Sequence, residues 1–166
     1  MNMMDNTGSN ETAQPLDEIL NGALAQKLGL GTQELGVALA TANAKLQSGQ
    51  GEKALALYAM LVLCRPREVD YQCGLANCAL QVQEYEVALQ AASAIIGLAP
   101  RDCRGYYFSG AACLGLGHLT EAREDIADAL KFAEDAVYPA FYEASQKLSA
   151  HLDTSLAGCP PRTNPN

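Results

Sequence analysis

Apolar residues recur at steps of three and four along most of the chain, which is the spacing of one face of an α-helix. This pattern predicts three consecutive pairs of helices. The first helices span about 36–48, 70–82 and 104–116, and the second helices span about 52–64, 86–98 and 120–133. Turns containing Gly, Gln, Ser or Glu separate the two helices of a pair, so each pair is expected to form a helical hairpin.

A separate helix is expected on the N-terminal side of these pairs, within 15–30. Pro15 is placed to open it, and Gly29 and Gly31 to end it. Its apolar side chains form one stripe: Leu16, Ile19, Leu20, Ala23, Leu24 and Leu28. The stripe belongs to no helix pair, so it is expected either to fold back on the chain or to associate with a second chain.

A last helix is expected over 137–152, where Phe141, Ala144 and Leu148 recur at helical spacing and would cap the third pair. Residues 1–14 and 153–166 are polar or rich in Pro, Gly, Ser, Thr and Asn. Such segments cannot bury enough apolar surface to offset the entropy lost on ordering. Both tails are therefore expected to be disordered.

The three helix pairs repeat with a fixed period of 34 residues. Three columns of the repeat hold small residues or proline: Ala42, Ala76 and Gly110; Ala54, Ala88 and Ala122; Pro66 and Pro100. The columns resemble the tetratricopeptide pattern, in which small residues lie where helices cross because a larger side chain would push the backbones apart. The sequence thus predicts an all-α solenoid over 31–152, with repeats at 35–68, 69–102 and 103–136.

Charge narrows the classes of partner. The chain of 166 residues carries a formal net charge of -8, with a pI near 4.6. Its field repels phosphate backbones and anionic lipids, so nucleic acid is not an expected partner. No stretch reaches the roughly 18 apolar residues of a membrane span, and the N-terminus lacks the basic start and apolar core of a secretion signal. A cytoplasmic protein that does not insert into membranes is expected.

No arrangement of residues typical of an enzyme is found in the sequence, and no metal or cofactor is expected. His118 and His151 are expected to be solvated polar residues. Without a secretion signal or a Cys-x-x-Cys pair, the cysteines are expected to be reduced thiols that fill the core. They are Cys64, Cys73, Cys78, Cys103, Cys113 and Cys159. An acidic run is expected to be a solvated convex face: Glu121, Glu124, Asp125 and Asp128.

A stack of such repeats presents a concave groove lined by the first helix of each pair, and steps of four and three residues place side chains in it. The predicted peptide-binding lining comprises Leu39, Asn43, Leu46, Cys73, Asn77, Leu80, Tyr107, Phe108, Ala111 and Leu114. Asn43 and Asn77 share one column. They either hydrogen-bond the backbone of an extended peptide, or they only cap the groove surface or form bonds between helices. Tyr107 and Phe108 are each expected either on the groove floor or in the core between helices. Tyr106 is expected in the core.

Related repeat domains that grip the acidic tails of heat-shock proteins surround paired asparagines with lysines and arginines. Leu39 and Cys73 stand where a lysine would be needed, and only Arg104 remains. A carboxylate clamp is therefore not expected.

The region from Ala99 to Gly110 reads APRDCRGYYFSG and is followed by the run LGLG at 114–117. Together with Gln47-Ser48-Gly49 in the first turn, it resembles the class II chaperones of bacterial type III secretion, the family of SycD, LcrH and CesD. Those chaperones have a similar stretch with the pattern P-R-x…Y-x-x-G…L-L-x-G. The resemblance covers about residues 16–150.

The resemblance implies a cytosolic chaperone that binds two hydrophobic translocator proteins and shields their aggregation-prone segments before export, without a nucleotide. An extended translocator segment would lie in the groove. A homodimer would form through the N-terminal helix, at Leu16, Ile19, Leu20, Leu24 and Leu28.

Because of one departure from the family, the resemblance does not indicate which residues of the substrate act as anchors. The family tends to have aromatic residues where this chain has Leu39, Asn43 and Leu46. Two other interpretations also remain: a general repeat scaffold that joins the subunits of an assembly, and a needle-subunit chaperone that works with a co-chaperone.

Overall fold

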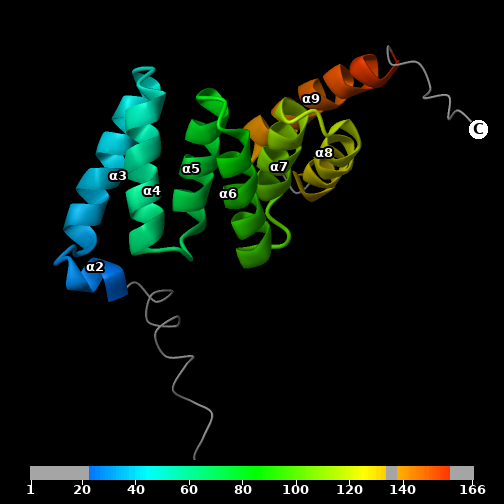
Figure 1. Ribbon diagram of the computed structural model, residues 1–166. Coiled ribbons are helices and arrows are strands. Elements are labelled where there is room, and N and C mark those ends of the chain that lie inside the picture. The colour runs from blue at the N-terminus through cyan, green and yellow to red at the C-terminus, as the bar shows by residue number, and fades with distance from the viewer. Residues whose placement is uncertain (1–22, 134–137, 158–166) are drawn as a thin grey trace, which may run out of the picture.

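The computed structural model describes residues 23–133 and 138–157 of the chain, and these ranges contain eight α-helices and no strand. The short α2 (Ala23–Lys27) precedes three hairpins. They are α3 (Thr32–Gln47) with α4 (Gly51–Cys64), α5 (Val69–Gln81) with α6 (Tyr85–Leu98), and α7 (Cys103–Gly115) with α8 (Leu119–Ala133). The last helix is α9 (Pro139–Ala157). Figure 1 shows the hairpins side by side in chain order, which confirms the expected all-α solenoid.

The small residues of the repeat columns lie where neighbouring helices pack. Ala54, Ala88 and Ala122 in the second helices are each 0% exposed. In the first helices, Gly110 is buried so closely that a Cβ there would come within 2.7 Å of the side chain of Ile126. Helix crossing therefore dictates the size of these residues, and it fixes the register of the stack.

The turn inside each hairpin uses the same backbone conformation at the same repeat position. Gly49, Gln83 and Gly117 have φ angles of 73°, 65° and 80°, which lie in the left-handed region. Glycine adopts this conformation without strain, whereas an ordinary side chain there costs about 1 kcal/mol. The middle turn therefore carries a small strain at Gln83 that its two neighbours avoid.

Two helix ends differ from the expected positions. α3 begins at Thr32 rather than near 36, because the carboxylate of Glu34 accepts a 2.9 Å hydrogen bond from the Gly31 N–H and so caps the first turn. α9 continues to Ala157, so the segment 153–157 is helical and is not part of a tail. Leu152, which is 0% exposed and packs in one cluster with Ile126, holds this last part of the helix.

Part of the predicted N-terminal helix lies outside the described residues. Leu16, Ile19 and Leu20 belong to that part. The two ends of the chain, 1–14 and 158–166, also lie outside the described residues. Within the described part, α2 ends before Gly29, which has a φ of 67°, as its sequence position predicts. α2 packs on α4, with Ala25 buried.

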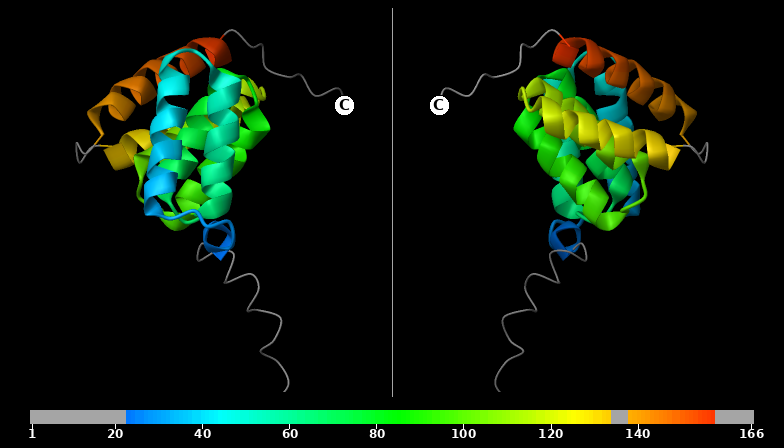
Figure 2. Two further views of the ribbon diagram at one scale, coloured as in Figure 1. Left: turned by 90° about the vertical axis from the view of Figure 1, so that its left-hand side faces the viewer. Right: turned by 90° about the vertical axis from the view of Figure 1, so that its right-hand side faces the viewer.

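α9 is a fourth first-type helix in the same register. Tyr138, Phe141, Ala144 and Leu148 follow Arg104, Tyr107, Gly110 and Leu114 by one period of 34 residues. α9 packs on both α7 and α8, as the first helix of a further repeat would. Figure 2 shows the start of α9, in orange, on the side of the stack where α3 lies.

The cysteines of the described chain are free thiols. Cys64, Cys78, Cys103 and Cys113 are buried, while Cys73 is partly exposed; Cys159 lies outside the described residues. Among the described helices, none combines the length and the apolar character needed to cross a bilayer.

Candidate functional site

The residues predicted to line a groove come from α3, α5 and α7, and we call their common surface the first-helix face. Most of its side chains are partly exposed: Leu39, Leu46, Cys73, Asn77, Leu80, Tyr107, Ala111 and Leu114. Asn43 is exposed, whereas Phe108 is only 3% exposed and belongs to the core. The face is therefore mainly apolar and partly open to solvent.

The two asparagines of the face differ in their surroundings. The side-chain carbonyl of Asn43 accepts a short hydrogen bond from the hydroxyl of Tyr58, a residue of α4 that is 3% exposed. Asn43 therefore links the two helices of the first hairpin, which is one of the two roles that the sequence left open. Asn77, one period later, is partly exposed and has the same place on α5.

Tyr58 itself is wedged between helices. A Cβ at Gly74 would overlap its ring, so a glycine at that point of α5 is what allows the ring to fit. Burial raises the pKa of the Tyr58 hydroxyl, which therefore stays protonated and able to donate to Asn43.

The aromatic residues at the start of α7 do not lie as expected. Phe108, not Tyr106, is the core residue: Tyr106 is partly exposed, its ring lies 5.1 Å from that of Phe132, and its hydroxyl donates to the carbonyl of Pro100. Tyr107 and Phe108 both make edge-on contacts with Phe141 of α9, at centroid distances of 5.3 and 5.5 Å. Phe108 also packs in one core cluster with Ala76, Ala92 and Ile95 of the preceding hairpin, whereas Tyr107 is only partly buried against that cluster.

Arg104 is the basic residue that the sequence predicts near this part of the face, and two carboxylates pair with it. Its guanidinium makes ion pairs of 2.7 Å with Asp102 and 2.9 Å with Asp70. Its Cζ lies 4.4 Å above the ring of Tyr138. Hydrogen bonding to Asp102 raises the pKa of Arg104 further above its usual value, so the guanidinium stays charged. Sequence reasoning missed this network, although the opposite charges one period apart were a signal for it.

Cys73 is the neutral neighbour of this network. Burial raises the pKa of its thiol to about 12, although the charge of Arg104 opposes the shift. A thiol that stays protonated is a poor nucleophile and a poor metal ligand, so Cys73 contributes apolar surface to the face.

The acidic run on α8 is not uniformly solvated, which corrects one expectation. Asp125 is partly buried and accepts a 2.7 Å hydrogen bond from the hydroxyl of Ser109 on α7. Burial raises the pKa of the Asp125 carboxyl, and that hydrogen bond partly opposes the shift. Glu121 and Glu124 are exposed, as expected.

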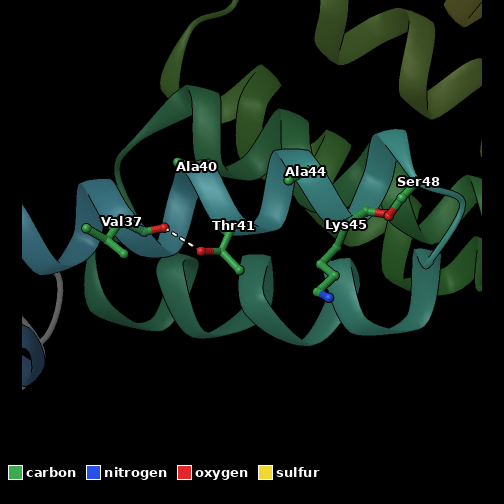
Figure 3. Close-up of a pocket in the computed structure, with 6 residues that line it drawn as sticks. All are labelled: Val37, Ala40, Thr41, Ala44, Lys45 and Ser48. Carbon is green, nitrogen blue, oxygen red and sulfur yellow. Dashed lines mark hydrogen bonds between the residues drawn. The ribbon is translucent and has the colours of Figure 1, made fainter.

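A second surface lies at the N-terminal end of the stack, on the outer side of α3. Ala44 is exposed there, whereas the residues one and two periods later, Cys78 and Ala112, are 0% exposed. No earlier hairpin among the described residues covers this side. An open depression of about 520 Å³ follows it (Figure 3) and is lined by Val37, Ala40, Thr41, Ala44, Lys45 and Ser48.

Comparison with known proteins supports the fold. A type III secretion complex from Aeromonas hydrophila matches with a TM-score of 0.76 at 15% identity, over 89% of this chain and 99% of that chain. The Yersinia enterocolitica type III secretion translocator chaperone SycD matches with a TM-score of 0.66 at 22% identity, over 78% and 96%. PcrH in complex with the chaperone binding region of PopD matches with a TM-score of 0.70 at 21% identity, over 77% and 97%.

These similarities define the class of fold. The chain has the tetratricopeptide fold of the SycD-like chaperones, as the sequence predicted. Tetratricopeptide domains solved with HSP90 and HSP70 peptides match with TM-scores of 0.66 and 0.64. No protein-family model and no curated protein matches the chain.

Proposed function

We propose that this protein is a cytosolic chaperone of hydrophobic type III translocator proteins, and that it holds an extended apolar segment of them on its first-helix face before export. The similar folds include a translocator chaperone, SycD, and a protein solved with the chaperone binding region of PopD, PcrH. Partly exposed leucines and a neutral thiol on the face offer apolar contacts to such a segment.

One observation carries the choice of an apolar partner over an acidic one. Arg104, which borders the face, is already paired with Asp102 and Asp70. An acidic peptide tail would have to displace two carboxylates to reach it. The face therefore favours partners that bring apolar side chains and main-chain amides.

The test is co-expression with a hydrophobic translocator from the same bacterium. We expect a soluble complex whose Kd changes little with salt, because apolar burial is not screened by ions. Leu39→Asp and Leu80→Asp should abolish the complex. Leu63→Asp is the control, because Leu63 on α4 is 62% exposed and lies outside the face. A complex that survives both face substitutions, or that weakens steeply with salt, would overturn the proposal.

Two alternatives remain as outcomes of the same experiment. A general scaffold would bind folded subunits of an assembly rather than an unfolded translocator. A needle-subunit chaperone would bind the needle protein only together with its co-chaperone. Parallel co-expression with the needle protein and co-chaperone separates that alternative from the proposed function.

A further inference from the structure

Aromatic residues gather at one end of the surface formed by α3, α5, α7 and α9. On α3 the exposed or partly exposed positions are Leu39, Asn43 and Leu46. At the α7–α9 end, Tyr107, Tyr138 and Phe141 are all partly exposed. Tyr107 and Phe141 occupy the repeat position that Leu39 has on α3, because they follow it by two and three periods.

Phe141 contacts each of the other rings. The ring of Phe141 meets Tyr107 at 5.3 Å and 84°, and Tyr138 at 6.3 Å and 81°. Beneath them, the buried ring of Phe108 meets Phe141 at 5.5 Å and 81°. The exposed parts of the Tyr107, Tyr138 and Phe141 rings are the surface on which a further aromatic ring would pack with the same geometry.

The electrostatics of this end favour an uncharged occupant. The Arg104 guanidinium above Tyr138 is paired with two carboxylates, and the neighbouring Cys73 thiol is protonated. Ala111, one turn beyond Tyr107, adds only a methyl group where the two earlier repeats have asparagine. The end thus offers ring surface, and an acidic side chain placed here would meet a guanidinium that is already paired with two carboxylates, so it would lose hydration without compensation.

We propose that the α7–α9 end is an aromatic subsite, which receives one aromatic side chain of the partner segment against Tyr107 and Phe141, while the α3–α5 end receives aliphatic side chains. The inference rests on the proposed function for the identity of the partner.

The subsite can be tested without knowing the translocator. The chain contains no tryptophan, so the fluorescence of N-acetyltryptophanamide, excited at a wavelength that tyrosine does not absorb, reports on that probe alone when it is added to the full chain. We expect saturable binding in the millimolar range, and weaker binding of N-acetylleucinamide as a competitor. Phe141→Leu and Tyr107→Leu should each raise the Kd about three- to tenfold, since each removes one aromatic contact.

Phe132→Leu is the matched control, because Phe132 also pairs with a tyrosine but lies on α8 near Tyr106. It should leave the Kd unchanged. Circular dichroism and the Tm show whether each variant folds. If either substitution at the subsite unfolds the chain, ring resonances of Tyr107 and Phe141 in the unaltered protein must shift on titration with the probe. The absence of saturable binding, or equal Kd values for all folded variants, overturns the subsite.

The same variants separate this inference from the proposed function. If Leu39→Asp abolishes translocator binding and Phe141→Leu leaves it unchanged, the chaperone function stands and the aromatic subsite fails. If the probe binds at Phe141 and the translocator binds nowhere on the face, the subsite stands and the proposed function fails.

Discussion

Arg104 and Asp70 stand at the same position of successive repeats and form a 2.9 Å ion pair between the starts of α7 and α5. Arg104 also pairs with Asp102 in the preceding turn and lies over Tyr138, which precedes α9. One side chain thus joins three parts of the stack. Because its charge is used within the protein, the first-helix face that it borders is left to bind by apolar contact.

The two ion pairs of Arg104 should differ in strength. The side chains of Arg104 and Asp102 are 13% and 11% exposed, whereas that of Asp70 is 71% exposed. Arg104→Met should lower the free energy of unfolding by about 2–4 kcal/mol, since it leaves a buried carboxylate without its partner. Asp70→Asn should cost less than about 1 kcal/mol, as solvent already screens that pair. Urea unfolding measures both, and equal losses would contradict the difference in burial.

Overpacking a helix crossing should destabilise the stack. Ala88 is 0% exposed where α6 meets its neighbours, so Ala88→Leu should cost on the order of 1–3 kcal/mol. Ala56→Leu is the control, because Ala56 has the same residue type on α4 but is exposed. Thermal unfolding of the two variants is the measurement. Equal stability of Ala88→Leu and the parent chain would mean that the helices do not cross at Ala88.

The sequence predicted the register well and the facing of the aromatic residues poorly. Columns of Ala and Gly with a 34-residue period occur because any larger residue would separate the helices, so they can be read from the chain itself. Phe108, rather than Tyr106, packs in one core cluster with Ala76, Ala92 and Ile95, which belong to the preceding hairpin. Spacing within one helix contains no information about that contact.

Substitutions of the two asparagines of the first-helix face should have different effects, one on folding stability and the other on translocator binding. Asn43→Ala would leave the buried Tyr58 hydroxyl without its acceptor and should lower stability by about 1–3 kcal/mol. Asn77→Ala should leave stability nearly unchanged and should weaken translocator binding by about 1–3 kcal/mol, if its amide pairs with a main-chain group of the partner. Unfolding curves and titrations of both variants measure the two effects. Unchanged binding by Asn77→Ala would remove Asn77 from the site.

Self-association remains a prediction about the N-terminal stripe of Leu16, Ile19, Leu20, Leu24 and Leu28. Leu28 is 59% exposed, and the outer side of α3 around Val37 is open as well, at 63%. Two copies that join at this end would cover both apolar surfaces. Sedimentation should give a dimer for the full chain at micromolar concentration and a monomer for a chain that starts at Leu30. Equal, monomeric masses would remove the dimer.

Stability should depend on pH through Asp125. Burial raises the pKa of its carboxyl above the usual 3.8, so the folded state disfavours the charged form. Below pH 3.8 the group is protonated in both the folded and the unfolded chain, and its full contribution to stability is present. As pH rises through the raised pKa, the folded state must bear a partly buried charge, and that contribution is lost.

Asp125→Asn should remove this dependence, because an amide stays neutral while its oxygen can still accept the hydrogen bond that the Ser109 hydroxyl donates at 2.7 Å. The Tm of the variant, relative to that of the parent, should therefore increase between pH 3 and pH 7 and then level off. Cys113, Glu124 and Asp128 also face the carboxyl, so the comparison uses the parent under identical conditions to cancel their titration. Glu124→Gln, at an exposed position of the same helix, should show a smaller change over that range. A Tm difference for Asp125→Asn that does not vary with pH would mean that the carboxyl is as well solvated in the folded chain as in the unfolded one.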